Sequence, residues 1–283
     1  MKVLLVGHGR WGSLLRERLD AKLGVENVWV ADAQEDRLPK GHIVSTNYLE
    51  LIGSPRDGAD GVVVATLPWQ HYEIALEAFQ RGKHVLVEKP LTMDVSQAKI
   101  LQHAAAVRGL TLMTDDTWQY ASSTRGLIDS GWEGQDLLIS WSNPHPGEAP
   151  RGGILWTQGP HPISVMMSLL GGKPKLVEGG IDPRRVNLKY TFPDGRTAEV
   201  HMAWDVYNKV REITWRHGTP GRPVPDGAGF VSMNAQLLSP GEDPVSNMLD
   251  KFLRSLKKPW VDDRAVDVVE VLEWSQSQIN ASS

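Results

Sequence analysis

The sequence predicts two domains of different class: an N-terminal α/β domain with a parallel sheet, and a C-terminal α+β domain with a mostly antiparallel open sheet. Up to about residue 114, short apolar runs alternate with segments of helical periodicity, which is typical of strands that helices cover on both faces. From residue 135, strand-like segments follow one another without helices between them. We therefore place the domains at residues 1–116 and 117–283, with the last helix able to return to the first domain.

The N-terminal domain is expected to follow a repeated strand and helix order. Apolar runs predict strands at residues 3–6, 27–32, 41–45, 59–66, 84–90 and 110–113. Helical periodicity predicts helices at residues 13–19, 48–52, 74–79 and 95–106, and Pro90 ends the strand that precedes the last of these. An alternation of this kind, without a repeat period, predicts a Rossmann-type domain.

The C-terminal domain is expected to begin with a helix at residues 121–130. Strands are predicted at residues 137–141, 186–190, 198–204 and 211–215, with a turn at residues 193–195 between two of them. Helices are predicted at residues 248–256 and 262–279. Residues 218–229 carry several prolines and glycines and are expected to form a loop.

Composition excludes several classes of function. A chain of 283 residues with a formal net charge of −4 has no basic face for nucleic acid or an anionic membrane, so a small anionic or neutral partner fits better. The absence of cysteine excludes disulfides, thiolate metal sites and thiol nucleophiles. The first apolar run is too short for a signal peptide, and no segment approaches membrane-spanning length, so we expect a cytoplasmic protein.

Three glycines directly after the first strand have the spacing G-x-G-x-x-G. Gly7 is expected to allow a tight turn, Gly9 to let the backbone approach a pyrophosphate, and Gly12 to let the following helix pack against the strand. The positive end of that helix would then face the phosphates. The pattern predicts a dinucleotide site.

Neighbouring residues extend this prediction. His8, Arg10 and Trp11 lie within the same turn, where Trp11 is expected beside the cofactor; Arg10 either neutralises the pyrophosphate or lies at the surface. Asp32 ends the second strand about 20 residues further on, at the position where a carboxylate holds a ribose diol. Because a carboxylate there repels a 2′-phosphate, and Ala33 and the following glutamine offer no arginine, NAD is favoured over NADP.

Three motifs stand together in this chain: the glycine turn, the Thr66-Leu67-Pro68 to His71 segment, and a strand that ends in Glu88-Lys89-Pro90. Together, and most specifically through the last of them, they resemble the glucose-fructose oxidoreductase, inositol dehydrogenase and rhizopine-catabolism (Gfo/Idh/MocA) family. Residues 152–161 are similar to the family's G-G-x-L-x-D-x-G-x-H helix. The resemblance covers nearly the whole chain.

The resemblance implies hydride transfer between a nicotinamide cofactor and a carbon that bears a hydroxyl, carbonyl or imine. It implies that Lys89 exchanges a proton with the substrate and that His161 is its partner, with Thr157 as the third residue of the catalytic set. A base or acid of this kind is needed because removing a hydride from a carbinol leaves a proton to be taken up. The implied cofactor contacts further along the chain are Thr66, Leu67, Pro68, His71, Glu88, Lys89 and Pro90. The implied substrate contacts are Gln119 and His161. Trp118 and Trp156 are candidate substrate contacts because their aromatic rings are able to stack on a sugar or a flat substrate.

Two positions depart from the family pattern, and both reduce the charge of the site. Thr157 stands where the family usually has Asp, and Gln119 where many relatives have Arg. Threonine can donate a hydrogen bond to a substrate but cannot accept a proton. Three hypotheses therefore stay open: an oxidoreductase for a sugar, cyclitol or related ketone, an imine reductase with the same cofactor, and a catalytically silent NAD sensor.

The 11 tryptophans allow two interpretations. Those near the second sheet either stack on a substrate or, as we favour, pack in the core or against a second subunit through the open sheet face, which predicts a homo-oligomer. No histidine pair has metal-ligand spacing, and Asp115 and Asp116 are interpreted as turn or capping carboxylates, so no metal site is predicted.

Overall fold

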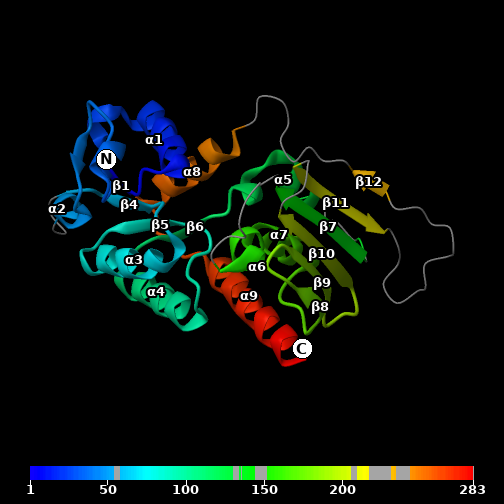
Figure 1. Ribbon diagram of the computed structural model, residues 1–283. Helices are drawn as coiled ribbons and strands as arrows, with labels where there is room; N and C mark the ends of the chain where they lie inside the picture. The colour runs from blue at the N-terminus through cyan, green and yellow to red at the C-terminus, as the bar shows by residue number, and fades with distance from the viewer. Residues whose placement is uncertain are drawn as a thin grey trace. The chain divides into compact units, whose positions relative to one another are not determined.

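The chain forms two compact units (Figure 1), described here from a computed structural model. The described residues are 1–53, 58–129, 134, 136–143, 152–204, 209–216, 231–233 and 243–282, so the loop predicted at 218–229 lies outside them. The first unit comprises Met1–Asp115 and Val245–Val269, and the second comprises Asp116–Pro244 and Glu270–Ser283. The segment that returns to the first unit therefore begins before the last helix and ends within it.

The first unit is built on a parallel six-stranded sheet in the order β3-β2-β1-β4-β5-β6. The strands are β1 (Val3–Val6), β2 (Val28–Ala31), β3 (Ile43–Ser45), β4 (Gly61–Val64), β5 (His84–Glu88) and β6 (Leu112–Asp115). Strands β1 and β4 are buried along their whole length, as their apolar runs predict. This strand order is that of a Rossmann fold, so the predicted fold class is confirmed for this unit.

Helices accompany the sheet of the first unit. They are α1 (Arg10–Leu23), α2 (Tyr48–Ile52), α3 (His71–Gln80), α4 (Val95–Arg108) and α8 (Pro244–Ser255), with 3-10 turns η1 (Val25–Asn27), η2 (Glu35–Arg37) and η3 (Pro68–Gln70). Local caps set the ends of α4, because the Asp94 carboxylate accepts from the backbone N–H of Gln97 and Gly109 ends the helix at φ +61°.

The returning segment packs against the sheet of the first unit. A Cβ on Gly61 would come within 3.0 Å of side-chain atoms of Phe252 and Leu256, so the glycine permits close packing. The hydroxyl of Thr111 donates to the carbonyl oxygen of Ser255 at 3.0 Å. The segment therefore belongs to the core of the first unit.

The second unit is built on a mixed six-stranded sheet in the order β12-β11-β7-β10-β9-β8. Its strands are β7 (Asp136–Asn143), β8 (Leu176–Ile181), β9 (Arg185–Thr191), β10 (Thr197–Trp204), β11 (Val210–Arg216) and β12 (Val231–Met233). All neighbours are antiparallel except β7 and β10. The predicted mostly antiparallel sheet is confirmed, although β8 and β12 were not predicted.

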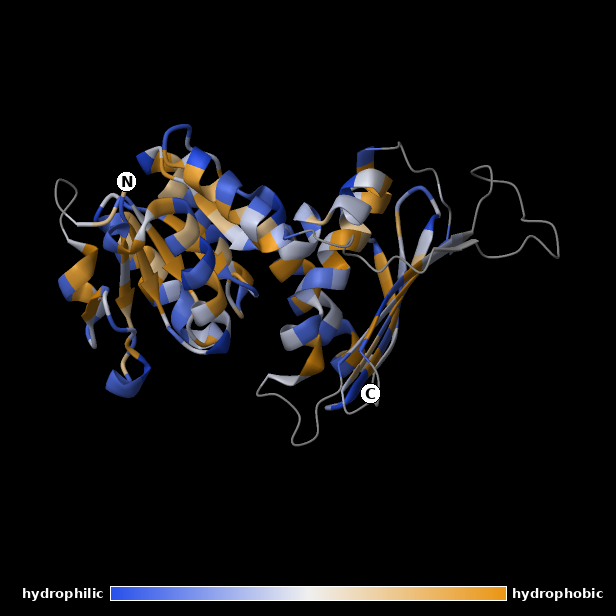
Figure 2. Cartoon of the chain, turned by 90° about the horizontal axis from the view of Figure 1, so that it is seen from above, coloured by the Kyte–Doolittle hydropathy of each residue, from blue (hydrophilic) through white to orange (hydrophobic). Residues whose placement is uncertain are grey.

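Helices cover one face of this sheet (Figure 1), and on the other face the alternate residues of β9, Arg185, Asn187 and Lys189, are exposed. The helical elements are η4 (Thr117–Tyr120), α5 (Ser122–Asp129), α6 (Gly153–Gln158), α7 (Pro160–Leu170) and α9 (Asp263–Ser282), whose first residues belong to the first unit. Trp141, Tyr190 and Trp215 are buried, and in each unit the hydrophobic residues of Figure 2 gather on the strands and the helix surfaces that face them. The Tyr190 hydroxyl lies 3.0 Å from Ser275 Oγ in α9, and burial raises its pKa.

Among the helices of the described residues, none combines the length and the apolar composition that crossing a bilayer requires.

Candidate active site

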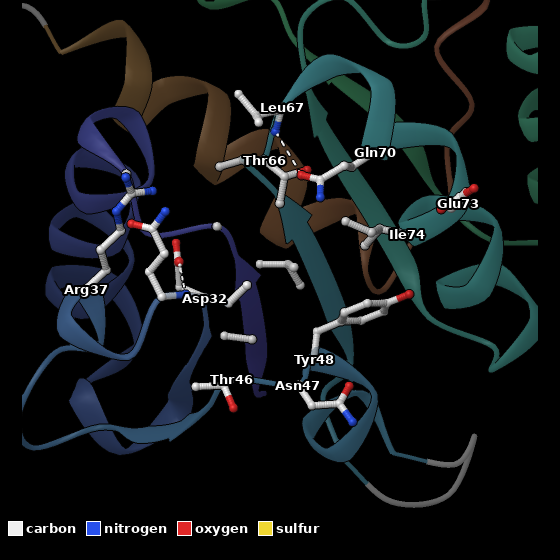
Figure 3. A pocket seen from close by; sticks show the side chains of 17 residues that line it. Asp32, Arg37, Thr46, Asn47, Tyr48, Thr66, Leu67, Gln70, Glu73 and Ile74 are labelled. Carbon is white, nitrogen blue, oxygen red and sulfur yellow. Dashed lines mark hydrogen bonds between the residues drawn. The ribbon is translucent and has the colours of Figure 1, made fainter.

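A pocket of about 580 Å³ lies in the first unit at the carboxyl ends of β1, β2 and β4. In Figure 3, Asp32 and Arg37 lie on one side of this pocket, and Thr66, Leu67 and Gln70 lie on the other. In an open parallel sheet, ligands bind outside the carboxyl ends of the strands where the strand order reverses. That reversal occurs here between β1 and β4. The lining residues are Val6, Gly7, Gly9, Ala31, Asp32, Ala33, Gln34, Arg37, Thr46, Asn47, Tyr48, Ala65, Thr66, Leu67, Gln70, Glu73 and Ile74.

The glycines between β1 and α1 have three different surroundings. Gly7 has φ +94°, and a Cβ there would lie 2.5 Å from the carbonyl oxygen of Ala65. A Cβ on Gly12 would lie 2.0 Å from the carbonyl oxygen of Gly7, so this glycine lets α1 pack against the turn. A Cβ on Gly9 would meet no atom within 4 Å, and Gly9 lines the pocket. The space beside Gly9 therefore belongs to the pocket.

Asp32 is held in the pocket wall by the main chain. Its carboxylate accepts from the backbone N–H of His8 at 2.7 Å and from that of Gln34 at 2.9 Å. The side chain is largely buried, at 9% exposure of the residue. Because a carboxylate has about four acceptor positions, Asp32 can also accept from ligand hydroxyls.

Arg37 also lines this end of the pocket, and sequence reasoning missed it. Its carbonyl oxygen lies 2.5 Å from His8 Nδ1, and His8 Nε2 accepts from Arg16 Nε at 3.1 Å. His8 is thus the Nδ1–H tautomer, which donates to Arg37. Arg16 also pairs with Asp20, which lies 2.9 Å from the ring of His42. This network fixes the loop after β2, which brings Arg37 to the pocket although it follows Asp32 by five positions.

The turn after β4 forms the opposite wall. Thr66 Oγ1 is buried and has no hydrogen-bond partner among the described residues, which leaves it able to bond a ligand in the pocket. His71 is fully buried, with Nδ1 2.8 Å from the carbonyl oxygen of Pro90 and Nε2 3.2 Å from that of Thr66. Burial lowers the pKa of His71, although the two carbonyl groups oppose this shift. The His71 ring therefore lies between the carbonyl oxygen of Thr66, which lines the pocket, and that of Pro90, which follows β5.

Two carboxyl groups and a lysine gather at the ends of β5 and β6. Glu88 pairs in register with Asp115, and Lys89 follows Glu88 directly. Burial raises the pKa of Glu88 to about 8; the carboxylate of Asp115 adds to the shift, and Lys89 opposes it. Trp11 Nε1 donates to Asp115 Oδ2 at 2.6 Å. The Asp115 carboxylate thus accepts a hydrogen bond from a side chain of α1.

His161 and Asp116 lie together in the second unit. His161 Nδ1 lies 3.4 Å from Asp116 Oδ1, and the other carboxylate oxygen accepts a hydrogen bond from the Ser164 hydroxyl. The rings of Trp118 and Trp141 lie 6.5 Å and 5.9 Å from that of His161, measured between centroids. The Asp116 side chain makes no capping hydrogen bond to η4, so the capping interpretation was wrong.

The remaining predicted residues of the second unit engage its own framework. Thr157 Oγ1 donates to the carbonyl oxygen of Gly153 at 2.9 Å, within α6. Gln119 is buried, and its amide bonds the hydroxyls of Ser164 and Ser168 in α7. Trp156 is buried and its indole N–H donates to Gln276 in α9 at 3.2 Å.

The structure brings only part of the predicted cofactor set to the pocket. Gly7, Gly9, Asp32, Thr66 and Leu67 line it. The other members of that set, which do not line it, are His8, Arg10, Trp11, Gly12, Pro68, His71, Glu88, Lys89 and Pro90. Besides Arg37, reasoning from the sequence missed two groups of lining residues, one that follows β3 and one in α3: Thr46, Asn47, Tyr48, Glu73 and Ile74. A Rossmann strand order, which places β3 and β4 on either side of β1 and β2, is the feature that could have indicated them.

Comparisons with known proteins agree with this geometry. Residues 1–115 match the Gfo/Idh/MocA family, an oxidoreductase family with an NAD-binding Rossmann fold. An uncharacterised oxidoreductase of Synechocystis is 36% identical over 292 residues, which cover 88% of this chain and 77% of that protein. The chain belongs to the Gfo/Idh/MocA oxidoreductase family.

An enzyme sequence and a solved structure also resemble this chain over most of their own length. The NADP-dependent scyllo-inositol 2-dehydrogenase of Bacillus subtilis is 27% identical over 290 residues, covering 95% of this chain and 76% of that enzyme. The structure of GenD2 from gentamicin A biosynthesis, solved with NAD, superposes with a TM-score of 0.80 at 21% identity, covering 100% of this chain and 95% of that chain. The second likeness supports the fold.

The pocket residues fit the dinucleotide that this family binds. Gly9 leaves open space at the start of α1, where backbone N–H groups and the helix dipole favour phosphate. Asp32 offers acceptors to a ribose diol, and Thr66 offers a hydroxyl without a partner among the described residues.

Proposed function

We propose that the protein is an NAD(H)-dependent oxidoreductase that interconverts a hydroxyl and a carbonyl group in a small polar substrate such as a sugar or a cyclitol. The observation that carries the proposal is the pocket at the β1–α1 turn, with Asp32 held by main-chain N–H groups at its ribose end. Membership of the family supports hydride transfer, and the inositol dehydrogenase relative supports a polyol.

The preference for NAD follows from two opposed charges in the pocket. Asp32 accepts from the ribose hydroxyls of NAD and repels the 2′-phosphate of NADP. Arg37 lines the same end and attracts that phosphate. Because Asp32 is buried and held by two N–H donors whereas Arg37 is exposed, the carboxylate dominates, and NADP binds as the weaker cofactor.

Lys89 is proposed as the group that exchanges a proton with the substrate oxygen. The bound nicotinamide would supply the acceptor or donor of hydride. In the oxidative direction the unprotonated amine of Lys89 accepts the hydroxyl proton, and in the reductive direction its ammonium group donates one. Glu88 and Asp115, which pair in register, lie at the same carboxyl end of the sheet as Lys89. His161, which the resemblance also marks, is proposed as a second acid–base residue of the reaction.

Substitution of Lys89 tests this role. Lys89→Met is expected to lower kcat by about 100-fold or more, the contribution of acid–base catalysis, and to leave the Kd for NADH little changed. The matched control is Lys99→Met, because Lys99 is exposed on α4. NADH absorbance would be followed with a panel of sugars, cyclitols, ketones and cyclic imines. Unchanged turnover in the Lys89 variant contradicts the proposal.

The same panel separates the remaining alternatives. Turnover of imines alone would favour an imine reductase, the alternative that Thr157 suggested. Tight NAD binding without turnover of any compound would favour a sensor.

A further inference from the structure

His161 is held at the start of α7 by aromatic packing. It is the second residue of α7, and its side chain is 15% exposed. The rings of Trp118 and Trp141 meet edge to face at 5.0 Å, and both lie against the imidazole. Aromatic packing of this kind limits rotation of the ring, but it does not decide which nitrogen carries the proton.

Asp116 supplies a polar contact that favours one tautomer of His161. A carboxylate only accepts hydrogen bonds, so the 3.4 Å approach of Oδ1 to His161 Nδ1 favours a proton on Nδ1. The second carboxylate oxygen is held by the hydroxyl of Ser164, which is 2% exposed. Gln119 Nε2 in turn donates to Ser164 Oγ at 3.1 Å. The Asp116 carboxylate is therefore held against α7 by Ser164, which Gln119 in turn holds.

The motif segment at residues 152–161 contains no carboxylate that could hold the His161 ring. Residue 157, one turn before His161, is a threonine whose hydroxyl donates to Gly153 within α6. Asp116 comes from the segment that follows β6, 45 residues before His161 in the chain. The carboxylate next to His161 thus comes from a different element than the sequence motif indicates.

We propose that Asp116 is a positioning residue that holds His161 as the Nδ1–H tautomer, in which Nε2 is the hydrogen-bond acceptor of the ring. The inference rests on the proposed function, because it assigns His161 a part in that reaction. If Nε2 accepts a proton, the Asp116 carboxylate stabilises the imidazolium that results. Ser164 and Gln119 act through Asp116.

Nitrogen NMR tests the tautomer directly, without substrate. Long-range proton–nitrogen spectra of the ¹⁵N-histidine-labelled protein distinguish a protonated ring nitrogen from an unprotonated one, and His161→Gln identifies the His161 signals by their loss. In the wild type, Nδ1 is expected to be protonated and Nε2 unprotonated. Asp116→Asn is expected to move the population toward the Nε2–H tautomer. The control is Asp129→Asn, an exposed carboxylate in the same unit.

Kinetics give the second measurement. Asp116→Asn is expected to lower kcat on the order of 10- to 100-fold, part of the 10²–10⁴ that acid–base catalysis contributes, with a smaller change in KM. Should Asp116→Asn fail to fold, Ser164→Ala decides the question, because loosening the carboxylate should shift the tautomer in the same direction by a smaller amount.

The outcomes separate this inference from the proposed function. Unchanged His161 nitrogen shifts in a folded Asp116→Asn or Ser164→Ala protein overturn the positioning role, whatever the activity. A tautomer shift in a protein that turns over no compound supports the positioning role and removes the proposed reaction.

Discussion

The two candidate carboxylates, Asp32 in the first unit and Asp116 in the second, are held in different ways. Asp32 directly follows β2 and is bound by backbone N–H groups of the glycine turn and of its own loop. Asp116 follows β6 and is bound by the side chains of His161 and Ser164, 45 and 48 residues further along the chain. A main-chain site follows from the course of the backbone, whereas a side-chain site depends on which residues a distant helix presents.

This difference predicts how each site responds to substitution. Main-chain donors at the first site survive most side-chain changes, so only residues that fix the backbone, such as the glycines, should remove it. At the second site, loss of a single hydroxyl or carboxylate should alter the geometry of the functional histidine.

The largest effect is expected at the glycines. Gly12→Ala places a Cβ 2.0 Å from the carbonyl oxygen of Gly7, so α1 must move; we expect a loss of roughly 1–3 kcal/mol in the free energy of unfolding, together with loss of NAD binding. Gly9→Ala meets no protein atom within 4 Å, and should cost at most about 1 kcal/mol as a helix N-cap while it still abolishes NAD binding by filling the pocket.

Urea denaturation and calorimetry with NAD would measure both variants. If both variants lost the same free energy of unfolding, the Cβ at position 9 would be clashing with protein atoms, and the space beside Gly9 would not be open to a ligand. Normal NAD affinity in Gly9→Ala would remove the pocket as the dinucleotide site.

The next effect is on cofactor choice at Asp32. Replacing Asp32 by Ala removes the charge that repels a 2′-phosphate and leaves Arg37, so the ratio of Kd values for NADP and NAD should fall by about 10-fold or more, the equivalent of 1.4 kcal/mol. Adding Arg37→Ala to this variant should reverse part of the gain in NADP binding. Titration of both cofactors measures the ratio, and an unchanged ratio would show that Asp32 does not read the ribose.

The contrast between the sites also explains which features were predictable from the sequence. The turn at Gly7 and the wholly buried β1 and β4 depend on local chemistry, and the fold class followed from them. Strand β8 was missed because Gly179 and Gly180 interrupt its alternation, so that Val177 is its buried residue. No local pattern marks Arg37, which reaches the pocket through a hydrogen-bond network around His8.

The second site was the less predictable one. The motif indicated His161, but the interpretation of Thr157 and Gln119 assumed that each faced a substrate. In the structure, the Thr157 hydroxyl bonds its own helix and the Gln119 amide bonds α7, while the carboxylate came from a dipeptide interpreted as a cap. The residues that hold Asp116 lie 45 and 48 positions away in the chain, and contacts over such a separation produce no local sequence pattern.

The smallest effect concerns the pH dependence of stability and the Glu88–Asp115 pair of the first unit. The pKa of Glu88 is raised from 4.5 in the unfolded chain to about 8 in the fold. Between these values the folded protein binds more protons than the unfolded chain, so the free energy of unfolding falls as pH rises. Glu88→Gln binds no proton in either state. It should therefore match the wild type near pH 5 and exceed it near pH 9 by about 1.4 kcal/mol or more, the equivalent of one pKa unit.

Urea denaturation across this pH range measures the slope, and Glu17→Gln is the control, because Glu17 is exposed on α1. A slope equal to that of the wild type in Glu88→Gln would mean that Glu88 is ionised in the fold. Because Asp115 contributes to the raised pKa of Glu88, Asp115→Asn should reduce the slope in the same direction by a smaller amount. If Asp115→Asn instead leaves the slope unchanged, burial alone holds the proton on Glu88, and the two carboxyl groups do not act as a pair.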